Sequence, residues 1–277
     1  MIGKIVSKKN LSEKVLQIDL YAPRIARNRK AGHFVIIKLN KNGERIPLTI
    51  SSANTENGTI QLIVQIVGVT SHKLSKMKIG DVVEDVVGPL GEATHIENYG
   101  TVLCAGGGVG IAPLLPIVQA LKEAGNRVLT VLAARSEELI ILEEQMKLHS
   151  DELIVMTDDG SYGNQGLVTH GMEEFINREQ VDFSVVIGPA IMMKFSSQLT
   201  KKFNIPTIAS LNTIMVDGTG MCGACRVSIN GKTKFACVDG PEFDAHEIDF
   251  DEMLQRLGGY KEEERAAYES FIHTLNE

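Results

Sequence analysis

The sequence predicts a chain of α/β plus all-β class, with two unlike domains in series and a cysteine-rich segment after them. Short alternating apolar runs separated by turn residues fill residues 1–97, and strands alternate with helices over residues 98–215. Three of the four cysteines stand together within residues 216–277. A length of 277 residues suits two domains, so we expect a β-barrel, an α/β domain and a C-terminal module over those three ranges.

The first domain is predicted to be a small antiparallel barrel. Its expected strands are Lys14–Tyr21, His33–Leu39, Arg45–Ser51, Thr59–Val67 and Asp81–Val87. Alternation of apolar and polar residues is typical of strands with one buried face, and Asn/Gly-rich segments are typical of the turns between them. The segment Gly88–Gly91 ends this pattern, so the domain boundary is expected shortly after it.

The second domain is predicted to be a doubly wound parallel sheet. Its expected strands are Thr101–Ala105, Arg127–Ala133, Glu152–Thr157, Ser184–Ile187 and Pro206–Leu211. The segments between them are predicted to be helices: Ile111–Ala124, Glu137–His149, Gly166–Asn177 and Ala190–Phe203. Cofactors of such sheets bind at the carboxyl ends of the strands.

A glycine-rich turn follows the first strand of this sheet. We call it the glycine loop; its residues are Gly106, Gly107, Gly108, Val109 and Gly110. Glycines here let a pyrophosphate approach backbone N–H groups at a helix N-terminus.

The next strand ends where the ribose of an adenosine would lie, at Ala134, Arg135 and Ser136. Arg135 and Ser136 favour a 2′-phosphate, whereas Asp158 and its acidic neighbours oppose one. The residues alone leave NAD and NADP open.

The cysteine loop, residues 217–237, carries the candidate metal ligands Asp217, Cys222, Cys225 and Cys237. Cys222 and Cys225 form a C-x2-C pair, and a short hairpin brings Cys237 back to them. A zinc ion and an iron–sulfur cluster both take a fourth ligand, for which Asp217 is the candidate. The alternative is that Asp217 only begins a turn, because Asp-Gly, here Asp217 and Gly218, is a common turn pair. Cys104, inside a predicted strand, is interpreted as a core residue, although it is the competing fourth ligand.

Composition excludes several classes of function. A net charge of −7 argues against a nucleic-acid or anionic-membrane partner. Clustered cysteines are typical of a metal site in a reducing cytoplasm, and the first fifteen residues lack the apolar core of a signal peptide. The uncharged run from Asn98 to Leu121 is interrupted by glycines and prolines, so no membrane span is expected.

The pattern D-x4-C-x2-C-x11-C resembles a known cluster-binding motif. Electron-transfer subunits of dihydroorotate dehydrogenase B have cysteine at all four positions of a similar [2Fe–2S] motif. Aspartate in the first position, here Asp217, resembles the small NAD-binding subunits of NADH-dependent ferredoxin–NADP oxidoreductase, an electron-bifurcating transhydrogenase. The whole chain is therefore identified as a member of the ferredoxin reductase-like family, with an FAD barrel, an NAD domain and a [2Fe–2S] loop.

The resemblance also implies site residues. A flavin-facing strand is matched by Ile46, Pro47, Leu48 and Thr49, with Thr49 opposite flavin N5 and acting in catalysis. Arg45 stands one residue before the arginine position of the family, which Ile46 occupies. The remaining matches are Thr70 and Ser71 for an FAD phosphate, Ile63, Val64 and Gln65 beside the adenine ribose, and Gly188 and Pro189 beside the nicotinamide.

The activity implied is hydride exchange between NAD(H) and FAD, with single electrons passing through the [2Fe–2S] cluster. The implied partner in the heterodimer is a larger subunit that carries FAD and [4Fe–4S] clusters, binds NADP(H) and reacts with ferredoxin. Three alternatives stay open: an electron-transfer subunit of dihydroorotate dehydrogenase B, a sulfide dehydrogenase subunit, and a zinc-stabilised nucleotide-sensing module.

The tail is predicted to end in a helix over Lys261–Leu275, preceded by a helical segment within His246–Leu257. An apolar stripe along the last helix consists of Tyr268, Phe271, Ile272 and Leu275. Packing on the body of the chain and docking to a partner both account for this stripe.

Overall fold

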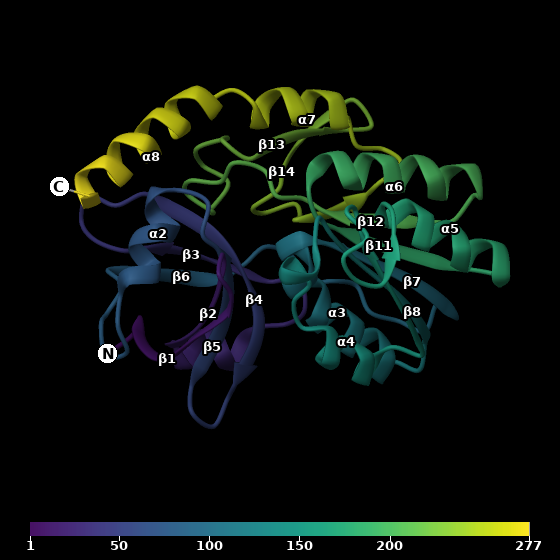
Figure 1. Cartoon of the computed structure of the whole chain (residues 1–277), viewed down its shortest axis with the longest axis horizontal. Helices are drawn as coiled ribbons and strands as arrows, with labels where there is room; N and C mark the ends of the chain where they lie inside the picture. Colours follow the sequence, from purple (N-terminus) through teal and green to yellow (C-terminus); the bar gives the residue numbers. More distant parts are fainter. Residues whose placement is uncertain (277) are drawn as a thin grey trace.

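The computed structural model describes residues 1–276 and contains a barrel, a parallel sheet and a C-terminal module (Figure 1). The barrel sheet is antiparallel, in the order β1-β2-β5-β4-β3-β6. Its strands are β1 (Lys4–Ser12), β2 (Val15–Tyr21), β3 (Phe34–Lys38), β4 (Arg45–Asn54), β5 (Thr59–Gln65) and β6 (Asp85–Leu90). Two short helices, α1 (Pro23–Asn28) and α2 (Val69–Lys76), connect them.

The strand β1 has no counterpart among the predicted strands. Only Ile5 of its nine residues is buried, and apart from Val6 and Leu11 the rest of the strand consists of lysines, serines and an asparagine. An edge strand with one solvated face gives little alternating signal, although backbone pairing with β2 holds it in the sheet.

Proline occurs inside β4 because this strand changes neighbours along its length. Residues 45–49 pair only with β3, whereas residues 50–54 pair with β5. Pro47 therefore lies where one side of the strand has no ladder partner, and its missing N–H costs no hydrogen bond.

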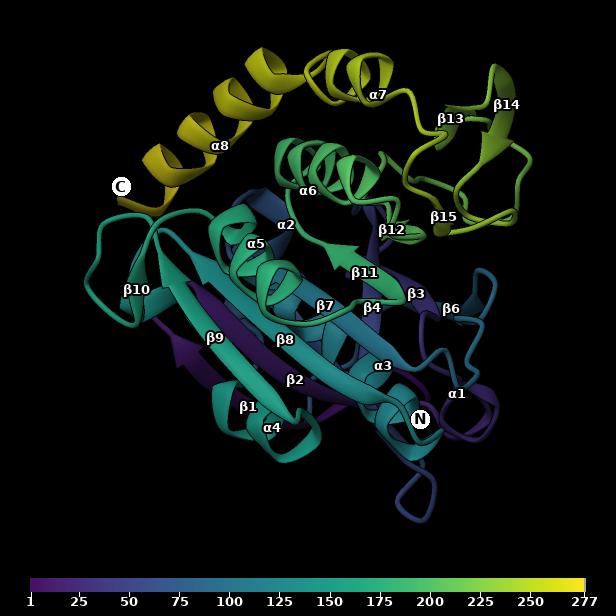
Figure 2. The ribbon, with the colours of Figure 1, turned by 90° about the vertical axis from the view of Figure 1, so that its right-hand side faces the viewer.

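The second domain is a doubly wound sheet in the order β10-β9-β8-β7-β11-β12-β15, as predicted apart from its edges. Helices α3 and α4 cover one face and α5 and α6 cover the other (Figure 2). The strands are β7 (Thr101–Gly107), β8 (Arg127–Ala134), β9 (Glu152–Thr157), β10 (Asn164–Gln165), β11 (Phe183–Ile187), β12 (Thr207–Ser210) and β15 (Glu242–Asp244). The helices are η1 (Gly108–Gly110), α3 (Ile111–Glu123), η2 (Glu137–Leu139), α4 (Glu143–His149), α5 (Val168–Arg178) and α6 (Ala190–Lys202).

The predicted helix Glu137–His149 is wrong in its first half. A single 3-10 turn over Glu137–Leu139 is followed by a break, and the α-helix starts only at Glu143. The break is at Leu142, whose φ of 58° is left-handed, while Ile141 before it is buried in the core. Burial of Ile141 thus outweighs the helical preference of the acidic segment.

The C-terminal module leaves the sheet after β12 and returns to it at β15, which pairs antiparallel with β12. Between them lies the hairpin of β13 (Arg226–Ile229) and β14 (Lys232–Phe235). After β15 come α7 (Phe250–Leu257), whose N-cap is Asp249, and α8 (Lys261–Asn276).

Helix α8 extends from α7 towards α2 of the barrel (Figure 1). Tyr268 and Phe271 contact His72 there, with a Tyr268 Oη to His72 Nδ1 distance of 3.4 Å and a ring distance of 5.5 Å for Phe271. Leu275 of the same stripe is 51% exposed. The stripe therefore packs on the chain in part and stays partly open to solvent.

The three parts share apolar cores, so they form one packed unit. Phe34 and Ile36 of the barrel lie in the cluster that also holds Cys225 and Cys237. Val15, Ala31 and Ile63 of the barrel pack with α3 in a second cluster. These contacts fix the orientation of the glycine loop and the cysteine loop relative to β3 and β4.

Candidate functional site

The glycine loop lies at the point where the strand order of the parallel sheet reverses. Strands β7 and β11 are neighbours there, with Gly106 opposite Ile187. A Cβ on Gly110 would lie 2.6 Å from the Ile187 carbonyl oxygen and 2.8 Å from Gly188 Cα. The structure thus brings the predicted pair Gly188–Pro189 against the glycine loop, and only glycine fits at position 110. A crevice at such a reversal is where open α/β sheets bind ligands.

The start of α3, directly after the glycine loop, suits an anionic ligand. The first turn of this helix contains no acidic residue, and the glycines leave backbone N–H groups uncovered by side chains. Met193 is fully buried, while the half-buried Met192 has its thioether beside Gly107 and Gly188. The fit to a nucleotide pyrophosphate therefore rests on backbone rather than on side chains.

The predicted ribose residues lie together one strand further along the sheet. Ala134 ends β8, and its carbonyl accepts a hydrogen bond of 3.1 Å from the Asp158 N–H. The next carbonyl, of Arg135, accepts one of 3.2 Å from Asp159. Hydrogen bonds from Ser161 lower the pKa of Asp159, which keeps that carboxylate charged. One exposed arginine and two aspartates thus share this edge, with Ser136 beside them.

The predicted flavin strand faces the glycine loop. Thr49 of β4 pairs with Phe34 of β3, and the stretch Ile46–Thr49 is half-buried. Helix α3 lies against β4, and the turn Gly108–Gly110 lies against β5. The structure therefore sets the two predicted cofactor segments, from different domains, across one interface.

Arg45 has two protein partners at the other end of this strand. Its Nη1 donates to Asp85 Oδ2 at 3.1 Å, and its Nε donates to the Val216 carbonyl at 3.0 Å. Arg45 as it stands joins the barrel to the residue before Asp217, and sequence reasoning did not find this contact.

The residues predicted to hold an FAD phosphate are engaged at the start of α2. Thr70 Oγ1 donates to Glu44 Oε2 at 2.5 Å, and Ser71 Oγ accepts the N–H groups of Val67 and Gly68 at 3.0 Å each. Ser71 therefore caps the helix, and a phosphate would take the place of Glu44 as the partner of Thr70. Ile63 and Val64 are buried, so only their backbone faces a ligand.

The four candidate metal ligands are brought together only in part, because the Asp217 carboxylate accepts a hydrogen bond from the Thr219 hydroxyl. The buried Cys225 and Cys237 have their sulfurs 3.2 Å apart. Cys222 is exposed, and hydrogen bonds from the backbone N–H groups of Ala224 and Asp217 lower the pKa of its thiol. Among residues 1–276, no three His, Cys, Asp or Glu side chains are grouped for one metal ion.

Burial, and the neighbouring Cys225, raise the pKa of Cys237 to about 12. A buried thiol pair of this kind loses its protons only when a cation replaces them. Cys104 lies fully buried in the middle of β7, where burial raises its pKa. Its surroundings there are those of a core residue.

The carboxyl group of the half-buried Glu242 joins the barrel, the segment between the domains and β15, and sequence reasoning missed it. Glu242 of β15 accepts a hydrogen bond of 2.7 Å from Thr94, in the segment between the domains. The carboxyl also lies close to Gly32 of the barrel. Burial raises the pKa of Glu242 to about 7. A single glutamate without a motif around it does not indicate, in the sequence, that its side chain joins different parts of the fold.

Comparison with known proteins assigns all three parts to cofactor-binding families. Residues 3–95 match an oxidoreductase FAD-binding domain and residues 105–198 an oxidoreductase NAD-binding domain. Residues 212–249 match the iron–sulfur cluster binding domain of dihydroorotate dehydrogenase B. The predictions of FAD, NAD(H) and an iron–sulfur cluster as cofactors are confirmed, and so is the predicted fold class.

Three known proteins show how far the similarity extends. A Thermotoga maritima protein named as a homolog of the dihydroorotate dehydrogenase B (NAD(+)) electron transfer subunit is 49% identical over 100% of this chain and 98% of its own. A chain in the structure of an NADH-dependent reduced ferredoxin–NADP oxidoreductase, described for flavin-based electron bifurcation, is 48% identical, with a TM-score of 0.93 and 98% of each chain covered.

The third is the cytochrome b5 reductase domain of Ulva prolifera nitrate reductase. It has a TM-score of 0.63 at 19% identity, and the match covers 74% of this chain and 93% of that one. This similarity shows the shared fold. In residues 1–276, no helix has the length and hydrophobicity needed to cross a membrane.

Proposed function

The chain belongs to the family of dihydroorotate dehydrogenase B-type electron-transfer subunits, and we propose that it is the small, NAD(H)-binding subunit of an NADH-dependent reduced ferredoxin–NADP oxidoreductase. The full-length similarity to a chain in the structure of such an enzyme supports this choice. Asp217 in place of a first cysteine favours it over a dihydroorotate dehydrogenase partner.

The observation that carries the proposal is the order of the three sites. Bound FAD exchanges a hydride with NAD(H) and single electrons with a [2Fe–2S] cluster. The glycine loop faces β4 and β5 from one side. On the other side, a Cβ on Gly218 would lie 2.9 Å from Ile36 Cγ1, and Ile36 of β3 is paired with Pro47 of β4. The flavin strand therefore lies between the nicotinamide site and the cysteine loop.

The residues that would take part in hydride exchange between NAD(H) and FAD act mainly by positioning the two cofactors. The glycine loop and Gly188–Pro189 hold the nucleotide, and Thr49 donates or accepts a hydrogen bond at the reacting edge of the flavin. Arg135 and Ser136 meet Asp158 at the ribose edge, where a carboxylate favours a 2′-hydroxyl over a 2′-phosphate. We therefore assign NAD(H) as the preferred nucleotide.

The order of the four candidate ligands along the chain suits a two-iron cluster. Each iron of a [2Fe–2S] centre takes two protein ligands, so Asp217 with Cys222 and Cys225 with Cys237 each supply one iron. We propose all four as ligands.

The exposed side of the cysteine loop is proposed to meet the partner. The cysteine loop and the residues directly beside it include exposed apolar side chains: Met221 is 88% exposed, Val216 48% and Val238 42%. Exposed apolar side chains of this kind are typical of the part of a surface that a partner covers. The partner is the larger subunit with FAD and [4Fe–4S] clusters, which binds NADP(H) and ferredoxin, and the cytoplasm is the proposed compartment. The functional divisions proposed are residues 1–97, 98–215 and 216–277.

The proposal is tested on the purified chain by its visible spectrum and by stopped-flow reduction. We expect one FAD and one [2Fe–2S] cluster per chain, with NADH reducing the flavin far better than NADPH. Thr49→Ala should slow flavin reduction by NADH about tenfold, the effect of one hydrogen bond of about 1.4 kcal/mol, while FAD stays bound.

Thr59→Ala, at the start of β5, is the control and should leave the rate unchanged. A zinc-containing chain without visible absorption would overturn the proposed function. An unchanged rate in Thr49→Ala would remove only the role of Thr49. Co-purification with a dihydroorotate-oxidising or sulfide-oxidising subunit from the native cell would replace the proposed partner.

A further inference from the structure

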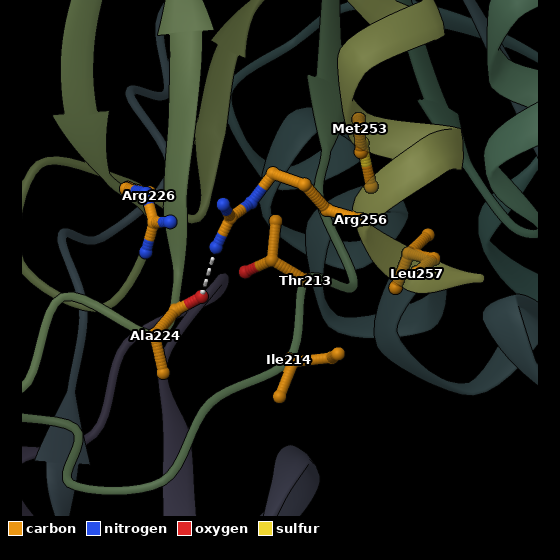
Figure 3. A pocket seen from close by; sticks show the side chains of 7 residues that line it. All are labelled: Thr213, Ile214, Ala224, Arg226, Met253, Arg256 and Leu257. Atoms are coloured by element: carbon orange, nitrogen blue, oxygen red, sulfur yellow. Dashed lines mark hydrogen bonds between the residues drawn. The ribbon is translucent and has the colours of Figure 1, made fainter. Parts of the chain in front are cut away.

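A small cavity lies in the C-terminal module, between the segment that follows β12, the start of β13 and helix α7 (Figure 3). Its volume is about 10 Å³, the space that one water-sized ligand needs. Three polar side chains line it, those of Thr213, Arg226 and Arg256, and apolar groups such as Ile214 and Leu257 form the rest of the wall.

The hydroxyl group of Thr213 has no hydrogen-bond partner in residues 1–276, although it is buried. The residue is 7% exposed, and Figure 3 shows its oxygen turned from the wall of the cavity towards the guanidinium group of Arg256. A buried hydroxyl without a partner loses the hydrogen bonds that it makes to water in the unfolded chain, and such groups are rare. The cavity therefore calls for a ligand that accepts a hydrogen bond from Thr213.

The two guanidinium groups make the surroundings of this hydroxyl positive. Arg226 Nη1 donates to the Gly223 carbonyl at 3.2 Å, and Arg256 Nη2 donates to the Ala224 carbonyl at 3.1 Å. A guanidinium has five N–H donors, so each arginine keeps donors for a further partner. Within residues 1–276, neither arginine forms an ion pair with a carboxylate. Two positive charges thus line the cavity without a counter-ion.

We propose that the cavity binds one small inorganic anion of the size of a halide ion. The hydroxyl of Thr213 and the free N–H groups of Arg226 and Arg256 all donate hydrogen bonds, and bonds between such donors and an anion are stronger than those to a neutral acceptor. A cation is repelled there, and a water molecule would leave both guanidinium charges uncompensated. None of the three residues is a candidate cluster ligand, so the inference goes beyond the proposed function and does not rest on it.

The anion would connect three elements of the C-terminal module. Thr213 lies in the segment after β12, Arg226 begins β13, and Arg256 is in the last turn of α7. A ligand that binds only the folded arrangement stabilises it by mass action. One heavy atom supplies little binding free energy, so we expect a Kd on the order of 0.1 M for chloride.

The first test is the line width of the chloride-35 NMR signal in solutions of the intact chain with its cofactors. Wild type should broaden the signal, and the broadening should saturate near the expected Kd. Thr213→Val and Arg256→Gln should each lower it at least threefold, whereas Thr213→Ser keeps the hydroxyl and should retain it. Arg24→Gln is the matched control, because it removes the same charge from an exposed position on α1. Equal broadening in all five proteins would overturn the inference.

The second test locates the anion and needs no variant. Crystals of the wild-type chain in sodium bromide should show an anomalous scattering peak within hydrogen-bond distance of Thr213 Oγ1. A water molecule at that place, or bromide only elsewhere on the surface, would overturn the inference even if a variant failed to fold.

The third test measures stability, because Thr213→Val removes the hydroxyl while keeping the shape of the side chain. Replacing sodium gluconate, whose anion is too large for the cavity, by sodium chloride at about 1 M should raise the folding equilibrium constant of wild type about tenfold more than that of the variant. Denaturant unfolding measures both constants. The same response to chloride in the two proteins would contradict an anion at Thr213.

Discussion

The glycine loop and the cysteine loop are both rich in glycine, yet the chain holds them by different means. The glycine loop is fixed at the ends of parallel strands, with backbone packed directly on backbone at Gly110. The cysteine loop lies outside both large sheets, has left-handed glycines at 218, 220 and 223, and is held by side chains from distant elements.

The difference follows from what each loop binds. A nucleotide is recognised by N–H groups that must already point the right way, so its loop needs a rigid frame. Metal binding itself brings its ligands together and contributes folding free energy. The cysteine loop can therefore depend on a few long-range contacts and on the cluster.

The sharpest way to test this contrast is to remove one cluster ligand. Asp217→Ala should lose the cluster or leave it labile, because three thiolates cannot complete four ligand positions. Flavin reduction by NADH should continue at the wild-type rate, since the glycine loop needs no metal. Iron analysis and stopped-flow absorbance measure the two effects.

Asp217→Cys is the matched variant, and it should keep a [2Fe–2S] spectrum with a different midpoint potential. Retention of cluster, spectrum and potential in Asp217→Ala would show that another residue ligates the iron.

The reverse experiment disturbs only the glycine loop. Gly110→Ala places a methyl group 2.6 Å from the Ile187 carbonyl oxygen, so the backbone must shift. Misplacement of about 1 Å lowers rates by about a hundredfold, and we expect kcat/KM for NADH to fall between tenfold and a hundredfold. Cluster content and potential should not change. Equal loss of cluster in this variant would mean that the loops are not independently held.

The tail provides a smaller test, because α8 spans from the C-terminal module to the barrel. Phe271→Asp combined with Ile272→Asp should weaken binding to the larger subunit about thirtyfold, the effect of an interface contact worth about 2 kcal/mol. Both residues are half-buried, so the isolated chain should remain folded. Binding is measured by titration calorimetry and folding by circular dichroism.

The control for the tail replaces Glu262 and Glu263, both exposed in the first turn of α8, with Ala. Unfolding of the aspartate variant would show that the stripe belongs to the core.

The smallest expected effect concerns Glu242, which joins the modules that hold the two loops. Its pKa, raised by burial to about 7, lies above its value in the unfolded chain. The folded state therefore binds more protons between about pH 4.3 and pH 7, and stability should fall as the pH rises through that window. Glu242→Gln should remove this fall, leaving a higher Tm than wild type at pH 8 and a similar one at pH 5. Parallel Tm profiles for the two proteins would contradict the assignment.

The sequence was sufficient where local pattern and backbone geometry decide the structure. Alternation located the inner strands of the barrel, and the glycine loop was placed because its residues must follow a strand and precede a helix. Contacts between residues far apart in the sequence could not be predicted from it. The hydrogen bond from Arg45 to Val216 joins positions 171 residues apart, and the resemblance placed Arg45 only one residue before the arginine position of the family.

The different roles of neighbouring residues in one motif were equally hard to predict. Thr70 and Ser71 read as a pair of phosphate donors, yet Ser71 caps its own helix and Thr70 binds Glu44. Which hydroxyl is available depends on the cap geometry and on a turn 26 residues earlier in the chain. The short strand β15 was missed because three residues are too few to show an alternation of apolar and polar side chains.

The chain leaves the parallel sheet after β12 and returns to it at β15. The residues at which it leaves and returns are in contact. The N–H of Leu211 donates to the carbonyl of Pro241 at 2.9 Å, so the 29 residues between them begin and end at one place. An insertion whose ends already meet imposes no rearrangement on its host. Exchange of this one insertion, residues 212–240, should therefore let the same flavin and nicotinamide domains pass electrons to a different acceptor. The insertion should also be transferable to a reductase that lacks a cluster.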